Sequence, residues 1–317
     1  MISPNSSIPE VTIGLPVYNG AQWLEQAIES LLAQDYENFK IIISDDCSDD
    51  ETPDICSSYS DQYNNIDFSV NKKNLGGDRN LIKILSNCES DYFVWASQDD
   101  YWHKDFLSTL VSKLEEDNKL VLASGNVEII RMDESSYVLD FLGYWNPENL
   151  NQYLLVAALL LPVSYGNWLK TNLFIHGVIR TSVLKKSFDL LVDEVCQDRT
   201  YILFTILQGR WGYVDKLLYY RRAGTGELVR DSQEFNIIQE KTKSHLTILA
   251  DAWLMTIGVW KIENVNILIK LNTYFMIVLY IFSMYTKKIK RRLIGANVLK
   301  RMLPNSLYNR IRLVINK

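Results

Sequence analysis

Two pairs of acidic residues, Asp45-Asp46 and Asp99-Asp100, each follow a short apolar run of the chain. Carboxylate oxygens bind hard divalent cations, and a pair at a strand end can share such an ion with diphosphate oxygens and water. A cation held there would neutralise charge that develops on a leaving group. The alternatives are structural: Asp99-Asp100 could be a solvated acidic turn, and Asp45-Asp46 could belong to the cap of the next helix.

Two further segments could contact a nucleotide. A turn that begins at Pro16 could place the ring of Tyr18 against a nucleobase, although a plain strand-to-helix turn explains it equally well. A loop that contains Gly76 ends close to Arg79, whose guanidinium could bind a phosphate or a base. An arginine on a helix surface is the usual alternative. The carboxylates of Asp45-Asp46 could also accept hydrogen bonds from a base or from ribose hydroxyls.

Strand-like and helix-like patterns alternate along the first 130 residues. Apolar, β-branched runs predict strands at 11–15, 39–44, 66–70, 91–96 and 120–130. Helical spacing of apolar residues predicts helices at 21–34, from Thr52 as N-cap onward, at 79–88 and at 104–116. This alternation predicts a mostly parallel sheet covered by helices on both faces. Ligands bind beyond the carboxyl ends of such strands, so the turn at 16–19 and both acidic pairs are expected to converge at one edge.

The remainder of the chain is less regular. We expect an insertion at 131–171 with a short helix at 152–161, strands at 173–179 and 213–220, and helices at 198–208 and 232–260. The composition is globular, with 47% hydrophobic and 22% charged residues among 317. Its four cysteines form no Cys-x-x-Cys pair, which argues against structural zinc or disulfides and favours reduced thiols in a cytosolic protein. The first ten residues carry no secretion signal.

Taken together, the motifs resemble the family 2 glycosyltransferases with the GT-A fold. The resemblance covers about residues 10–225, is strongest in the first 115, and rests on the order, spacing and strand-end position of the segments 15–20, 44–52, 74–77 and 97–102. The Gln98-Asp99-Asp100-Tyr101-Trp102 segment is most similar to bacterial members that build surface polysaccharide, rhamnosyltransferase-like ones among them. The implied fold is α/β, with a mostly parallel central sheet flanked by helices and a helical, basic C-terminal segment.

The resemblance also implies roles for individual residues. Asp100, with Asp99, would bind Mn²⁺ or Mg²⁺, and Asp198 would be the catalytic base. Trp102, His176 and Gly177 would lie on the acceptor side. The nucleotide-sugar side would be formed by Pro16, Val17, Tyr18, Asn19, Asp45, Asp46, Gly76, Arg79, Gln98, Asp99, Arg221 and Arg222.

Three departures from the family pattern bear on function. Ser97 stands where many relatives have Asp, Gln197 replaces the usual Glu or His, and Ala223 replaces a His that in some members helps hold metal or diphosphate. Arg221 or Arg222 could neutralise phosphate instead. The departures leave room for a catalytically inactive nucleotide-sugar-binding or scaffold subunit, although the intact acids argue against it. A dinucleotide-dependent dehydrogenase is disfavoured because no GxGxxG motif follows the first strand.

The charge of the chain is unevenly distributed. Residues 265–317 hold 11 basic and no acidic residues, whereas the preceding 264 residues hold 22 basic and 38 acidic ones. The uncharged stretch 271–286 is shorter than the roughly 20 residues of a membrane span. An interfacial helix with a polybasic neighbour is therefore expected, with a buried helix on the catalytic domain as a nearly equal alternative.

The expected organisation is a GT-A catalytic domain at 1–230, followed by a helical, membrane-associated segment at 231–317. The catalytic domain is expected to have a nucleotide-sugar half at about 10–130 and an acceptor half at about 131–230. The resemblance implies an inverting transfer from a UDP-, dTDP- or GDP-linked sugar to a glycan acceptor. That acceptor would be lipid-linked, at the cytoplasmic face of the cell membrane, in O-antigen or capsule synthesis. No nucleic-acid partner is expected.

Overall fold

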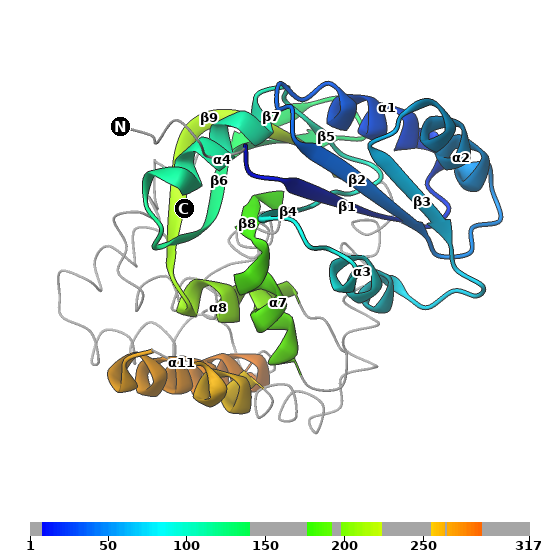
Figure 1. Cartoon of the computed structure of the whole chain (residues 1–317). Helices are drawn as coiled ribbons and strands as arrows, with labels where there is room; N and C mark the ends of the chain where they lie inside the picture. Colours follow the sequence, from blue (N-terminus) through cyan, green and yellow to red (C-terminus); the bar gives the residue numbers. More distant parts are fainter. Residues whose placement is uncertain (1–7, 140–175, 192–197, 224–254, 264, 287–317) are drawn as a thin grey trace.

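A computed structural model describes residues 8–139, 176–191, 198–223, 255–263 and 265–286. The first half of these residues alternates strands and helices as the sequence predicts (Figure 1). The strands of this half are β1 (Val11–Val17), β2 (Phe39–Asp45), β3 (Ile66–Val70), β4 (Tyr92–Trp95), β5 (Tyr101–Trp102), β6 (Leu120–Arg131) and β7 (Ser136–Leu139). Its helices are α1 (Ala21–Leu32), α2 (Thr52–Gln62), α3 (Gly77–Ser86) and α4 (Phe106–Glu116).

The second half adds fewer strands. It contributes β8 (Val178–Arg180), α7 (Thr181–Asp189), α8 (Asp198–Leu207), β9 (Arg210–Ala223) and α11 (Ile267–Thr286). Residues 255–261 are also helical. The strands form one nine-stranded sheet in the order β3-β2-β1-β4-β8-β6-β9-β5, with β7 paired to β6.

The direction of strand pairing changes along this order. The first four strands pair in parallel, and their register places Val17 beside Asp45 and Gly14 beside Trp95. Beyond β4, only the β6–β9 pairing is parallel, and the others are antiparallel. The α/β class is therefore confirmed, but the prediction of a mostly parallel sheet holds only for β1 to β4. A parallel pair needs a crossover connection, which successive β-α-β units supply there, whereas β5 and β8 enter the sheet without one.

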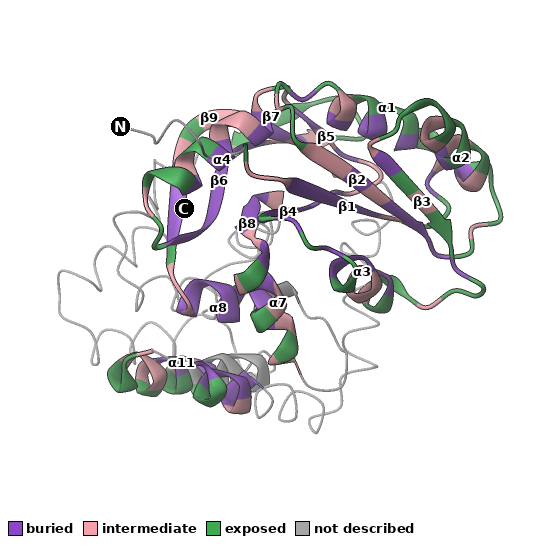
Figure 2. Ribbon diagram, in the orientation of Figure 1, coloured by how far each residue is buried: buried purple, intermediate pink, exposed green. Residues whose placement is uncertain are grey.

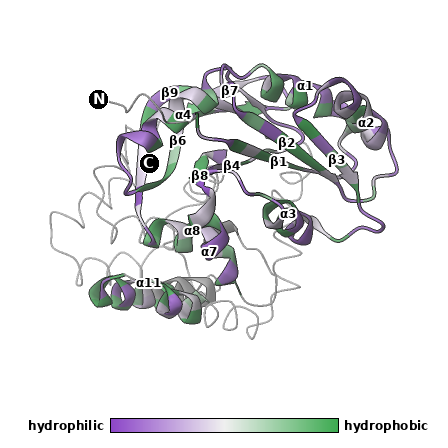
Figure 3. Cartoon of the chain, in the orientation of Figure 1, coloured by the Kyte–Doolittle hydropathy of each residue, from purple (hydrophilic) through white to green (hydrophobic). Residues whose placement is uncertain are grey.

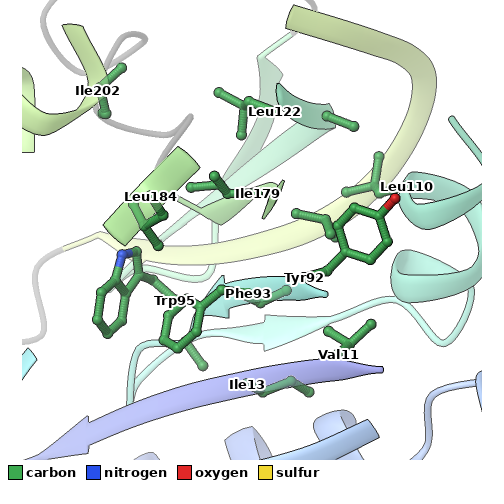
Figure 4. Packing of buried hydrophobic residues seen from close by; sticks show 14 of the residues in the cluster. Val11, Ile13, Tyr92, Phe93, Trp95, Leu110, Leu122, Ile179, Leu184 and Ile202 are labelled. Atoms are coloured by element: carbon green, nitrogen blue, oxygen red, sulfur yellow. The ribbon is translucent and has the colours of Figure 1, made fainter. Parts of the chain in front are cut away.

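Helices cover both faces of the sheet. Figure 1 shows α1, α2 and α4 above the strands and α3, α7 and α8 below them. Between these layers the core is built from fully buried apolar side chains of neighbouring strands, such as Ile13 of β1, Phe93 of β4 and Ile179 of β8, with Leu184 of α7 packed beside them (Figure 4). Removing this apolar surface from water is the main driving force for folding.

Several predicted boundaries differ from the observed ones by a few residues. Thr52 is the first residue of α2 rather than its N-cap, and its hydroxyl accepts a hydrogen bond from Gly20 N at 2.9 Å. The short strands β5 and β7 were not predicted. Two residues are too few for a periodic pattern in β5, and β7 lies in the segment 131–171, which was expected to be an insertion. The predicted helix at 152–161 and most of the predicted helix at 232–260 lie outside the described residues.

The C-terminal described segment packs on the domain through a helix pair. Adding a Cβ to Gly258, in the helical stretch 255–261, would bring it within 2.2 Å of the Phe204 ring on α8, so this helix lies directly against α8. Thr273 and Ile277 of α11 are buried as well. Among the described residues, no helix is long and apolar enough to cross a bilayer.

Candidate active site at the carboxyl edge of the sheet

Asp46 organises the loop that precedes α3. Its buried carboxylate accepts hydrogen bonds from the backbone N–H groups of Leu75 at 2.8 Å and Gly76 at 2.9 Å, and from the Asn71 amide at 2.9 Å. Gly76 has a φ of +85°, a conformation that glycine adopts without strain. Charged acceptors make the stronger hydrogen bonds, so Asp46 fixes this loop beside the edge where β2 ends.

A network of hydrogen-bonded polar side chains supports the same loop. The Asn71 amide also donates to Asn80 at 3.0 Å, and Asn80 in turn donates to the Ser44 carbonyl at 2.8 Å. The Lys83 ammonium donates to Asn71 at 2.7 Å and to the Ser44 and Ser69 hydroxyls. Sequence analysis missed this network. Its signal was the polar face of the amphipathic helix α3, where Asn80 and Lys83 lie three residues apart.

The turns after β1 and β2 are joined by hydrogen bonds. Asn19 N–H donates to the Ser48 hydroxyl at 2.9 Å, and the Asn19 side chain accepts from Asp49 N–H at 3.0 Å. Asp45, which is fully buried, accepts from the backbone N–H of Ser48 at 3.1 Å and from its hydroxyl. Asp45 therefore holds its own turn and does not cap α2, whose N-cap is Glu51 with no side-chain cap hydrogen bond. Tyr18 is left 47% exposed at the rim.

Gln98 links the turn after β1 to the turn after β4. Its side-chain oxygen accepts from Tyr18 N–H at 2.8 Å, and its side-chain nitrogen donates to the Tyr18 carbonyl at 3.1 Å. A Cβ on Gly20 would lie 2.3 Å from the Gln98 amide, so a larger residue there would displace this amide from Tyr18. The turn at 16–19 and the turn that carries Asp99-Asp100 therefore lie side by side, as predicted.

Asp100 is the buried acid of the second pair. Its carboxylate accepts hydrogen bonds from the Tyr219 hydroxyl and from Arg222 N–H, the latter at 2.9 Å. Burial raises the pKa of Asp100 to about 7, and the neighbouring charge of Asp99 adds to the rise. Burial also raises the pKa of Tyr219, which keeps its hydroxyl a neutral donor to Asp100.

The two arginines at the end of β9 have different surroundings. Arg222 donates to the Asp99 carbonyl at 2.7 Å and to the Gln26 side chain, and its guanidinium lies 4.2 Å from the Trp23 ring centroid. Arg221 acts electrostatically on Asp100, lowering the pKa of that carboxyl against the larger effect of burial. Successive strand residues point to opposite faces, so Arg221 shares the face of Tyr219 while Arg222 points toward α1.

His176 packs on Tyr219 rather than standing apart from the acids. The two rings stack with centroids 4.6 Å apart, and His176 Nδ1 lies 3.3 Å from the Trp95 carbonyl. Burial and the charge of Arg221 lower the pKa of His176 to about 3, so the imidazole is neutral at pH 7. Gly177 lets the chain pass close to β6, because a Cβ there would lie 2.3 Å from the Ala123 carbonyl oxygen.

The remaining predicted site residues lie on several strands and helices. Trp102 is buried against Tyr219, with ring centroids 5.5 Å apart, and its indole N–H has no hydrogen-bond partner within the described part of the chain. Pro16 and Val17 are the last residues of β1, and Arg79 lies in the first turn of α3. Asp198 is the first residue of α8, and its side chain lies outside what the structure describes.

Tyr219 is the main contact of Asp100 that sequence analysis missed. It directly precedes the Tyr220-Arg221-Arg222 segment, and the two-residue period of a strand places it on the face of Arg221. That period was the available signal. The pairing of β9 with β5, which joins Tyr219 to Trp102, is what brings it to the acidic turn.

Comparison with known proteins shows what the first half of the chain resembles. Residues 12–162 match the family model described as Glycosyl transferase family 2. An uncharacterized glycosyltransferase of Rickettsia typhi is 36% identical over 139 residues, which are 44% of this chain and 42% of the relative. The dTDP-rhamnosyl transferase RfbG of Shigella flexneri is 33% identical over 106 residues, 32% of this chain and 36% of the relative. Residues 12–162 of the chain are therefore similar to the family 2 glycosyltransferases.

Solved structures agree on the fold. S. aureus TarS in complex with UDP-GlcNAc superimposes with a TM-score of 0.64 over 95% of this chain and 78% of that one, at 17% identity. The mannosyltransferase PcManGT from Pyrobaculum calidifontis, in complex with GDP-Man and Mn²⁺, gives 0.51 over 98% and 84%, at 14% identity. The chain has the GT-A fold of these enzymes. It spans less than half the length of the first curated relatives it matches.

Proposed function

We propose that this chain is an inverting glycosyltransferase that moves a sugar from a nucleoside-diphospho-sugar to a hydroxyl group of a glycan acceptor. The observation that carries the proposal is the buried Asp100, which lies with Asp99 and the charge of Arg221 at the carboxyl edge of the sheet. The loops fixed by Asp46 and Gln98 border the same edge. Such edges are where α/β sheets bind their ligands.

The acidic turn fits a divalent cation, Mn²⁺ or Mg²⁺. Asp100 accepts a hydrogen bond from Tyr219 on one carboxylate oxygen and from Arg222 N–H on the other, and each such oxygen has two acceptor positions. A cation would also relieve the repulsion from Asp99 that helps raise the Asp100 pKa. The described residues contain no cluster of three potential ligands, so diphosphate oxygens and water would have to complete the coordination of an ion here. When bound, the ion would stabilise the charge of the departing diphosphate.

In the proposed reaction the acceptor oxygen attacks the anomeric carbon as its proton passes to the Asp198 carboxylate. The bond from the anomeric carbon to the diphosphate oxygen breaks on the opposite face, which inverts the configuration, and the nucleoside diphosphate leaves with the bonding electrons. Arg221 is suited to the diphosphate side, since its charge acts on Asp100 at the acidic turn. Trp102, His176 and Gly177 remain our candidates for the acceptor side, with Trp102 and Gly177 acting from buried positions.

The relatives guide the choice of donor and acceptor. TarS was solved with UDP-GlcNAc, PcManGT with GDP-Man, and RfbG is named a dTDP-rhamnosyl transferase. We therefore propose a UDP-, dTDP- or GDP-linked donor and a role in bacterial surface polysaccharide synthesis, O-antigen or capsule. A lipid-linked acceptor at the cytoplasmic face of the cell membrane suits the basic residues of 265–317. In this proposal residues 1–230 form the catalytic domain and 231–317 the membrane-associated segment.

Donor hydrolysis tests the proposal without an identified acceptor, because water can take the acceptor's place. Candidate nucleotide-sugars are first screened by thermal shift, and hydrolysis of the best binder is then measured with Mn²⁺. We expect Asp198→Ala to bind donor normally and to lose turnover. Asp189→Ala, an exposed acid at the end of α7, is the matched control and retains it. Wild-type turnover in Asp198→Ala would remove Asp198 from its role.

The same assay separates the enzyme from a catalytically inactive nucleotide-sugar-binding or scaffold subunit. An inactive subunit would bind donor in the thermal-shift screen and show no hydrolysis with Mn²⁺, whichever residue is changed. Binding accompanied by Mn²⁺-dependent hydrolysis would exclude it.

A further inference from the structure

The helix α11 has two sides of opposite exposure. On one side Thr273 and Ile277 are buried, and Ile269 packs against the core cluster. This side fastens the helix to the domain. In Figure 1, α11 lies beyond α7 and α8, on the side of these helices away from the strands.

The opposite side of α11 is apolar and exposed. At about 100° per residue, its members cover an arc roughly 120° wide, centred opposite Ile269 and Thr273. Figure 2 colours part of this helix as exposed, and Figure 3 colours several of its segments as hydrophobic. We call these six residues the outer face of α11: Ile267, Leu268, Leu271, Tyr274, Phe275 and Val278.

The edge of the outer face is amphipathic. Lys270 is the one charged residue in the α11 sequence, and its ammonium donates to the Trp260 carbonyl at 3.0 Å. The same ammonium lies 5.9 Å from the centroid of the exposed Trp260 ring. Tryptophan and lysine with apolar stems are typical of the boundary between lipid and water.

The charge of the neighbouring sequence favours one partner. From residue 265 onward the chain has no acidic residue, and five basic ones follow α11 within six positions: Lys287, Lys288, Lys290, Arg291 and Arg292. Contiguous exposed apolar surface marks an interaction site, and polybasic sequence beside it is complementary to anionic lipid headgroups.

We propose that the outer face of α11 docks on an anionic lipid bilayer, with the helix axis parallel to the membrane surface. Its apolar side chains enter the headgroup boundary to a depth of about 5–10 Å. The buried Thr273 and Ile277 keep the opposite side on the protein, so the helix lies on the membrane rather than across it. This assigns a surface to the membrane location suggested under the proposed function, and it does not depend on sugar transfer.

The test is cosedimentation of the full chain with vesicles of phosphatidylcholine and phosphatidylglycerol, and with phosphatidylcholine alone. The double variant Leu271→Glu/Phe275→Glu is expected to bind the anionic vesicles roughly 100-fold more weakly, because two inserted side chains become charged. The matched control Met132→Glu/Val138→Glu changes two exposed apolar residues near β7 and is expected to bind normally. Far-UV circular dichroism and thermal unfolding verify that both variants fold.

Three results would overturn the inference. The first is equal binding of the α11 variant and the native chain to anionic vesicles. The second is no binding of the native chain to anionic vesicles at all. The third is a native dimer, seen by light scattering, that Leu271→Glu/Phe275→Glu dissociates while vesicle binding stays unchanged, because the outer face would then contact a second copy. Donor hydrolysis by the α11 variant in solution is expected to equal that of the native chain, so failure here is distinct from failure of the proposed reaction.

Discussion

The turns that follow β2 and β4 carry the same dipeptide, Asp-Asp, at the same edge of the sheet, yet the carboxylates are used differently. Asp46 accepts two backbone N–H groups and an amide, all from the 71–76 loop, and Asp45 holds its own turn. Asp100 is met instead by a hydroxyl and a backbone N–H from β9, with a second acid beside it. Three loop donors hydrogen-bond to the Asp46 carboxylate, whereas burial beside Asp99 raises the pKa of Asp100.

Both pairs are Asp-Asp, so residue type does not explain the difference between them. The number of hydrogen-bond donors around each carboxylate decides whether it stabilises the fold or remains suited to chemistry. An anion that is compensated by local donors costs little to bury, and its loss leaves those donors unpaired. An anion that is only partly compensated needs a further positive charge, which a cation or a substrate-bound ion can supply. The first pair is therefore expected to govern stability and the second to govern activity.

The largest effect is expected at the second pair. Asp100→Asn keeps the shape of the side chain, its amide oxygen can still accept from Arg222 N–H, and it removes the charge. We expect Mn²⁺-dependent donor hydrolysis to fall by about 1000-fold, as for loss of one strong electrostatic contact in an active site. The unfolding free energy should stay equal or rise, because a buried charge is lost. Full activity with unchanged Mn²⁺ dependence would remove Asp100 from the metal site.

The next effect is expected at the first pair. Asp46→Ala leaves the N–H groups of Leu75 and Gly76 and the Asn71 amide without their acceptor. We expect a loss of about 3 kcal/mol in unfolding free energy, measured by urea denaturation. The control Asp49→Ala changes an exposed acid in the same turn and should cost about 0.5 kcal/mol or less. If Asp46→Ala cost no more than its control, the contrast between the two pairs would be wrong.

A smaller effect separates the two arginines next to the second pair. Arg222→Ala removes contacts to the Asp99 carbonyl, Gln26 and Trp23, and should lower the unfolding free energy by about 2 kcal/mol. Arg221→Ala should raise the donor KM about ten-fold, as for loss of a charge-assisted contact. Equal changes in stability and KM for both variants would show that the strand alternation does not divide their roles.

The sequence predicted the parts of this site that depend on local pattern. The runs that became β1 to β4 are apolar and bounded by turns, so the sheet edge and the turns around Tyr18 and Asp100 followed from them. It did not predict the hydrogen bond from Tyr219 to Asp100. The two residues lie 119 positions apart, and the pairing of β9 with the two-residue strand β5 brings them together. Nor did it predict that Asp46 holds the 71–76 loop, because hydrogen-bond partners depend on tertiary placement.

The smallest expected effect concerns pH and the neutral His176 beside the second pair. Its folded pKa is lowered to about 3 from an ordinary value of 6.5. Between these values the unfolded chain binds a proton that the folded one does not, so stability is complete above about pH 6.5 and falls as the pH drops, by at most about 1.4 kcal/mol per unit. His176→Phe keeps a ring against Tyr219 and lacks the titration. Its urea unfolding free energy should therefore fall less steeply between about pH 6 and pH 5 than that of the native chain. Equal slopes would mean that His176 is protonated in the folded protein, and a second positive charge would then face Asp99 and Asp100.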